Sequence, residues 1–178
     1  MRSAIVTTAG ASAAFAKNRP EVIRKACILL LVTACSLLAV SAVAAPPGTC
    51  SVTPVGSISF GNYDVFSTVP LDAVGTIQIT CDLTEAHTII SLGPSQNGSG
   101  FNPRQMKNVS SGDLLAYNLF TNTARTTVWG DGTGGTSMVT QRVFKKAPAI
   151  VTIYGRMAAG QNVRAGTYTD TVTVTINW

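Results

Sequence analysis

The sequence predicts an all-β protein, a β-sandwich of immunoglobulin-like type. From residue 50 onward apolar residues alternate with polar ones at a period of two, which is the pattern of half-buried strands. Clusters of Gly, Pro, Asn and Asp divide this pattern into about seven short segments, and none of them shows the spacing of a helix. Several short strands separated by turns favour two packed sheets over any other architecture.

The expected strands follow one another in a regular series. The first contains Pro54 and Gly56, which suits an edge strand or a bulge. The last is the most regular, with apolar residues on one face and threonines on the other. The strands are expected, in order, at 51–60, 76–83, 88–92, 115–121, 139–144, 149–154 and 171–178, with turns or loops at 61–64, 93–102, 123–136 and 160–166.

The start of the chain predicts a secretory signal peptide. Arg24 and Lys25 precede an apolar run at 26–40, and small residues follow it. A charged region, an apolar region and an A-x-A end are the three parts of such a leader, and they place cleavage after Ala44. The chain therefore divides into a leader, 1–44, and one domain, 45–178.

Two other interpretations of the leader stay open. The apolar run is shorter than the roughly 20 residues of a membrane-spanning helix, which argues against an anchor. It also continues past Cys35, which argues against a lipoprotein processed at that cysteine. Residues 1–23 make the leader unusually long, which suggests a start codon assigned too far upstream.

Removal of the leader changes the charge of the protein. The whole chain carries +5, but five of its 13 Lys and Arg and one of its eight acids lie in residues 1–44. The domain keeps eight basic and seven acidic residues, a net charge of about +1. No basic patch remains, which argues against binding of RNA or DNA.

The cysteines of the domain predict a disulfide. Cys27 and Cys35 leave with the leader, and Cys50 and Cys81 remain as a pair in an exported protein. The alternative, two free thiols or half of a metal site, has no His or Cys partner nearby. Closing a loop of this length stabilises a fold by about 3–4 kcal/mol.

Enzyme chemistry finds little support in the sequence. The single histidine, His87, lies at the entry to a strand. No G-x-S-x-G motif supplies a nucleophile for which it could act as the base. The segment 130–135 matches G-x-G-x-x-G, but a β pattern follows it where a nucleotide site needs a helix. The acidic residues are scattered near turns, without calcium or zinc spacing, and Asp170 is expected to be a turn or hydrogen-bonding residue. We therefore expect no catalytic residues, no cofactor and no metal.

One set of segments is specific as a group and spans the whole domain in order. These segments are 50–52, 60–64, 77–81, 117–120, 129–132, 154–156 and 166–178. Together they resemble the spore coat protein U family, which includes archaic chaperone–usher pilins.

The resemblance implies an incomplete immunoglobulin-like fold whose final strand is supplied in trans. A groove beside the last strand would be filled first by a periplasmic pilus chaperone and later by a neighbouring pilin subunit, with an outer-membrane usher as a further partner. It also implies export through the periplasm to the cell surface, a role in adhesion or biofilm, and a subunit-specific surface at 93–113. The residues expected to line the groove are Val172, Val174, Ile176 and Trp178.

The sequence departs from fibre-forming subunits in one respect. Cleavage after Ala44 leaves only residues 45–49 before Cys50, and their two prolines exclude a donor strand. Such a subunit would accept a strand without giving one, as at a tip or terminal position. Cleavage near Ala34 would instead leave 36–45 as a donor.

Two rival functions are also compatible with the sequence. One is a self-contained spore-coat or matrix protein whose last strand is paired within the chain. The other is a secreted carbohydrate-binding module, in which exposed aromatic rings would stack on sugars. The candidate rings for such stacking are Tyr63, Tyr117, Trp129 and Tyr154.

Overall fold

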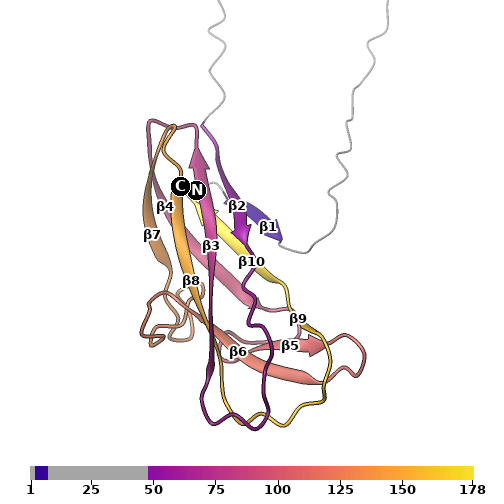
Figure 1. Cartoon of the computed structure of the whole chain (residues 1–178). Helices are drawn as coiled ribbons and strands as arrows, with labels where there is room; N and C mark the ends of the chain where they lie inside the picture. Colours follow the sequence, from indigo (N-terminus) through magenta and orange to yellow (C-terminus); the bar gives the residue numbers. More distant parts are fainter. Residues whose placement is uncertain (1–2, 8–47) are drawn as a thin grey trace, which may run out of the picture. The chain divides into compact units, whose positions relative to one another are not determined.

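The described part of the chain consists of strands and the loops that join them. The computed structural model describes residues 3–7 and 48–178, and within these ranges it contains no helix (Figure 1). The described residues therefore offer no helical segment of the length and hydropathy that crossing a membrane requires.

The strands form two sheets. One has the order β1-β10-β4-β7 and the other the order β2-β3-β8-β6-β5-β9, with antiparallel pairing throughout. The predicted all-β sandwich is thus confirmed. The strands are β1 Ser3–Thr7, β2 Cys50–Gly56, β3 Leu71–Cys81, β4 Glu85–Ser95, β5 Arg104–Asn108, β6 Leu114–Phe120, β7 Val139–Phe144, β8 Ala149–Met157, β9 Tyr168–Thr169 and β10 Val172–Asn177.

Most predicted strands occur, with longer bounds than the alternation indicated. β3 begins at Leu71 and β8 ends at Met157, because partly exposed residues extend the pairing of these two central strands. The first strand is shorter than expected and ends at Gly56. It lies at a sheet edge with a register shift between Pro54 and Gly56, as predicted from these two residues.

The predicted turn at 93–102 is only partly correct. Gly93–Ser95 continues β4, and β5 follows at Arg104–Asn108. The sequence hides β5 because its two most buried residues, Arg104 and Asn108, are polar. The predicted loop at 123–136 contains only isolated bridges, at Val128 and Trp129.

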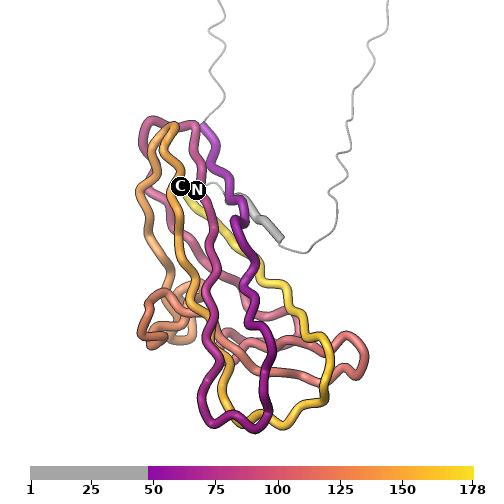
Figure 2. The backbone as a smooth tube through the Cα atoms, viewed as in Figure 1, coloured from indigo at the N-terminus to yellow at the C-terminus, as the bar shows by residue number. Residues whose placement is uncertain are grey.

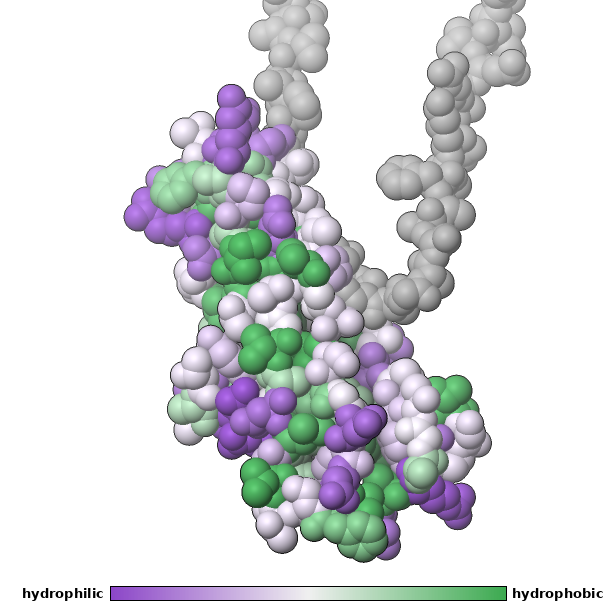
Figure 3. Space-filling view, viewed as in Figure 1, coloured by the Kyte–Doolittle hydropathy of each residue, from purple (hydrophilic) through white to green (hydrophobic). Residues whose placement is uncertain are grey.

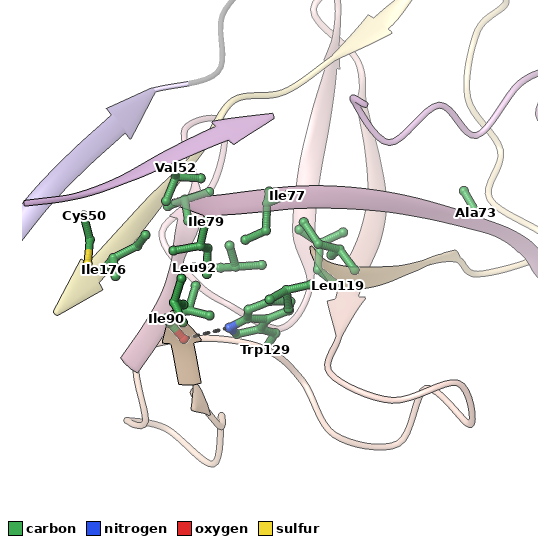
Figure 4. Packing of buried hydrophobic residues seen from close by; sticks show 14 of the residues in the cluster. Cys50, Val52, Ala73, Ile77, Ile79, Ile90, Leu92, Leu119, Trp129 and Ile176 are labelled. Atoms are coloured by element: carbon green, nitrogen blue, oxygen red, sulfur yellow. Dashed lines mark hydrogen bonds between the residues drawn. The ribbon is translucent and has the colours of Figure 1, made fainter. Parts of the chain in front are cut away.

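The core lies between the two sheets, as Figure 4 shows. Ile79 of one sheet and Ile90 and Ile176 of the other are fully buried there. Trp129 reaches this core from its loop, and its indole Nε1 donates a hydrogen bond to the carbonyl oxygen of Ile90 at 3.1 Å. The loop is thereby fixed to the sandwich through its one large apolar side chain.

The predicted disulfide is present. Cys50 and Cys81 face each other at the paired ends of β2 and β3, with an S–S distance of 2.05 Å. The bond ties the first strand of the domain to its neighbour, where β2 makes its only strand pairing within the described residues.

After β2, residues 57–65 form no strand and instead lie over the inner face of the sheet. The side chains of Ile58 and Phe60 lie directly over Gly75 and Gly155, where an added Cβ atom would clash with them. Phe60 also packs edge-on against Tyr117, with ring centroids 5.9 Å apart. Two glycines on the inner face of the sheet therefore allow segment 57–65 to run close against it.

Candidate functional site: an accepting strand edge and the cavity beside it

β10 has two unequal neighbours. On one side it pairs with β4, from Val172 opposite Ser95 to Asn177 opposite Ile89. On the other side it pairs only with β1, over Thr173–Asn177. Because Ser3–Thr7 lies inside the predicted leader, cleavage after Ala44 would remove this partner, and within residues 48–178 no strand pairs with that edge.

The four residues predicted to line a groove share the inner face of β10. Val174 and Ile176 are buried, and Val172 and Trp178 are half-buried and packed against the core. The indole Nε1 of Trp178 donates to the carbonyl oxygen of Gly48 at 3.3 Å, which holds the end of β10 beside the start of the domain. The common face is as predicted, and a groove-lining role stays a prediction.

The edge of β10 lacks two of the features that normally prevent strand addition. Val172–Asn177 contains no charge and no proline, whereas sheet edges are usually blunted by charges, prolines or bulges. β2, an edge of the other sheet, has both a proline and a bulge. β7, the far edge of the same sheet, carries Arg142 and runs into Lys145 and Lys146. The long edges thus differ in how readily they could accept a strand.

A cavity of about 770 Å³ lies where β2 ends and where the chain approaches β10. Its two walls are segments 57–65 and 163–168, which run alongside each other in the lower part of Figure 2. Its floor consists of Met106, Leu115 and Met157 from β5, β6 and β8. The cavity therefore lies against part of the inner face of this sheet, where Leu115 and Met157 are buried and Met106 is half-buried.

The walls of the cavity are held by polar contacts. The hydroxyl of Tyr63 donates to the carbonyl oxygen of Ala158 at 2.7 Å and accepts from the amide of Gln161 at 2.9 Å. Asp64 and Arg164 lie on opposite walls, and the nearest carboxylate to Arg164 is that of Asp113, at 3.7 Å. Apolar surface is also visible in the lower part of Figure 3. Phe66, which follows segment 57–65 in the chain, is 90% exposed.

A buried polar network lies behind this site. Arg104 is fully buried, and it donates to the carbonyl oxygens of Gly93 and Trp129 and to Oδ1 of Asn118 at 2.7–3.1 Å. Burial lowers the pKa of Arg104 to about 10, so the guanidinium stays charged at neutral pH. This role could not be predicted from the sequence, because Arg104 follows a turn-rich segment and breaks the apolar alternation.

The side chains considered for other chemistry do not assemble into a site. His87 is exposed on β4, and its Nε2 lies 3.1 Å from Glu85. Segment 130–135 is a loop, as predicted. Among the described residues no group of three or more His, Cys, Asp or Glu is placed to hold a metal ion.

The four aromatic rings considered for sugar stacking are also dispersed. Trp129 and Tyr117 are buried in the core, and Tyr63 is half-buried in the cavity wall. Tyr154 lies on β8 under the guanidinium of Arg125, 5.8 Å from the ring centroid. No two of these rings make an exposed stacking platform within the described residues.

Comparisons with known proteins agree with this architecture. The model of the Spore Coat Protein U domain family matches residues 34–175. "Protein U" of Myxococcus xanthus is 36% identical over 132 residues, which cover 69% of this chain and 72% of that protein.

Solved structures resemble the chain in fold. A complex of the chaperone CsuC with the tip adhesion subunit CsuE, from archaic chaperone–usher Csu pili of Acinetobacter baumannii, matches with a TM-score of 0.52 and 21% identity, over 74% of this chain. The chain spans only 40% of the length of that structure. A chaperone–tip adhesin complex of CFA/I fimbriae matches with a TM-score of 0.40 and 11% identity, over 71% of this chain and 41% of that one, too weakly to carry an argument.

Proposed function

The chain belongs to the Spore Coat Protein U domain family, and from that premise we propose that it is an exported structural subunit of a bacterial surface fibre. In this proposal the subunit assembles by accepting a strand along β10. The observation that carries it is the unprotected edge of Val172–Asn177, which leads toward a cavity with an apolar floor.

Backbone pairing would supply the affinity. An added strand can hydrogen-bond to the free amides and carbonyls of β10 while alternate side chains enter the core, as in other cases of β-augmentation. The pairing with β1 gives the geometry of such a strand, which is antiparallel and reaches from Asn177 to Thr173. An incoming strand that continued past Thr173 would come to the walls of the cavity and could cover Met106, Leu115 and Met157.

The partners follow from this chemistry. A periplasmic pilus chaperone would cover the edge after export, a neighbouring pilin subunit would replace it, and an outer-membrane usher would pass the subunit to the cell surface. The subunit would then act in adhesion or biofilm, without catalysis.

The position in the fibre depends on the leader. Cleavage after Ala44 leaves too few residues to donate a strand, which fits a tip or terminal subunit. The family match begins at residue 34, ahead of that cleavage point, and it supports the alternative in which 36–45 is retained as a donor. Residues 36–45 lie outside the described residues, and mass spectrometry of the exported protein distinguishes the two cases.

A second function is favoured by one observation. β10 is paired on both sides in the whole chain, because Ser3–Thr7 occupies the free edge. If these residues are retained, the sandwich is complete, and the protein acts as a self-contained coat or matrix component. A carbohydrate-binding module is less well supported, since Tyr117 and Trp129 lie in the core.

The test is a chain that carries its own complementing strand. A five- to seven-residue strand of alternating apolar and polar residues is joined after Trp178 through a four-residue turn, which allows it to run antiparallel to β10. We expect a monomer with a raised melting temperature that no longer binds a pilus chaperone. The control fusion has the same length with prolines at alternate positions, which cannot pair. Equal behaviour of the two fusions would refute strand acceptance at β10.

A further inference from the structure

Asp170 lies where the chain crosses from one sheet to the other. It follows β9, which pairs with β5, and it precedes β10, which pairs with β4. The position of this corner therefore determines where the accepting strand begins.

Strand pairing is irregular at this point. Between Val172 and Val174 the register of β10 against β4 shifts, so that Thr173 faces both Gly93 and Pro94. Pro94 has no amide hydrogen to donate. The carbonyl oxygen of Gly93 accepts from Arg104 at 2.8 and 3.1 Å. Pro94, opposite the start of β10, consequently donates no ladder hydrogen bond to it.

The carboxylate of Asp170 makes other bonds there. Its Oδ1 accepts from the amide of Gln96 at 3.2 Å and from Nδ2 of Asn97 at 3.0 Å, both just beyond the end of β4. Its Oδ2 accepts from the hydroxyl of Tyr117, on β6 of the opposite sheet, at 2.6 Å. One side chain thus joins the β9–β10 corner to both sheets.

The protonation states of Tyr117 and Arg104 favour a charged Asp170 carboxylate that accepts a hydrogen bond from Tyr117. Burial, and then the hydrogen bond to Asp170, raise the pKa of Tyr117, so its hydroxyl remains a proton donor. Arg104 lies opposite Tyr117 in the β5–β6 pairing and is buried without a carboxylate within ion-pair distance among the described residues. The negative charge of Asp170 also favours the charged form of Arg104.

We infer that Asp170 is a positioning residue for strand capture, because it holds the first residues of β10 against β4 while the opposite edge is free. The effect on strand capture rests on the proposed function, whereas the attachment of β10 through Asp170 is independent of it. Without the carboxylate, the start of β10 keeps its pairing with Ser95 but loses three side-chain hydrogen bonds, and an incoming strand meets a less firmly held edge.

Hydrogen exchange on the exported chain tests this inference. Asp170→Asn removes the charge and places an amide group where Tyr117 donates, and Tyr117→Phe keeps the ring and removes only the hydroxyl. We expect both variants to speed amide exchange in 172–177 at least tenfold, with the amides of β3 and β8 unchanged. The matched control is Asp113→Asn, since that carboxylate makes long contacts with Arg164 alone, 3.7 Å from Nε and 3.4 Å from the backbone amide, and it should leave exchange in β10 unchanged.

Two results would overturn the inference. One is wild-type exchange in 172–177 in both variants, and the other is an equal acceleration in every strand, which would assign Asp170 to global stability alone. The exchange measurement needs no captured strand. If the variants speed amide exchange in β10 alone and the protein binds no chaperone, the proposed function is refuted and the role of Asp170 stands.

Discussion

Ile176 offers a direct test of how much β10 contributes to the domain. Its side chain is 0% exposed, while Ile150, on the outer face of β8, is 55% exposed. Truncating a buried isoleucine to alanine removes apolar contact and leaves a cavity, and such changes cost about 2–5 kcal/mol. We expect Ile176→Ala to lower the free energy of unfolding by this amount, and Ile150→Ala to lower it by less than about 1 kcal/mol.

The assay is urea denaturation of the exported wild-type protein and both variants, followed by tryptophan fluorescence. Domains are commonly stable by only about 5–15 kcal/mol, so the loss at Ile176 would be a large share of the total. If β10 is also the accepting strand, Ile176→Ala should reduce the yield of chaperone complex while Ile150→Ala does not. Equal denaturation midpoints for the two variants would refute the placement of Ile176 in the core.

Two further predictions concern the disulfide and the response to acid. Replacing Cys50 and Cys81 together by alanine opens a loop with a sequence separation of 31 residues, and we expect a loss of about 3–4 kcal/mol in the same assay; an unchanged denaturation midpoint would contradict it. The hydrogen bond from Arg156 holds the pKa of Asp72 below its ordinary value, so this carboxylate stabilises the fold fully above that ordinary value and loses its contribution as the pH falls through its folded pKa. Asp72→Asn should therefore lower the denaturation midpoint at pH 6 and have little effect at pH 2, and the same loss at both values would exclude the ion pair as the cause.

The alternation of apolar residues was enough to predict the class of fold. Threonines alternate with buried valine and isoleucine in β10, and this pattern identified both the strand and its inner face. Pro54 and Gly56 likewise predicted an edge with a bulge, because a proline cannot donate to a ladder and a glycine permits a sharp change of direction.

The parts that could not be predicted depend on tertiary contacts. β5 was missed because Arg104 and Asn108 are buried through hydrogen bonds and not through apolar character. The close approach of segment 57–65 to the sheet needs Gly75 and Gly155 to lie under Ile58 and Phe60, which only the pairing of β3 with β8 establishes. The cavity follows from that wall, so it had no counterpart in the sequence.

Asp170 illustrates the limit of reasoning from sequence. Its place before the last strand predicted a turn or hydrogen-bonding residue, and the structure confirms that role. Its partners, Gln96, Asn97 and Tyr117, come from two distant segments that no local pattern connects.

The most direct test of the account is export of the whole chain to the periplasm, with and without a pilus chaperone of the archaic chaperone–usher type, followed by gel filtration and mass spectrometry. The account predicts cleavage of the leader, a soluble one-to-one complex with the chaperone, and aggregation or degradation of the subunit produced alone. A stable monomer that ignores the chaperone would contradict it and would establish a closed sandwich, as in a coat or matrix protein.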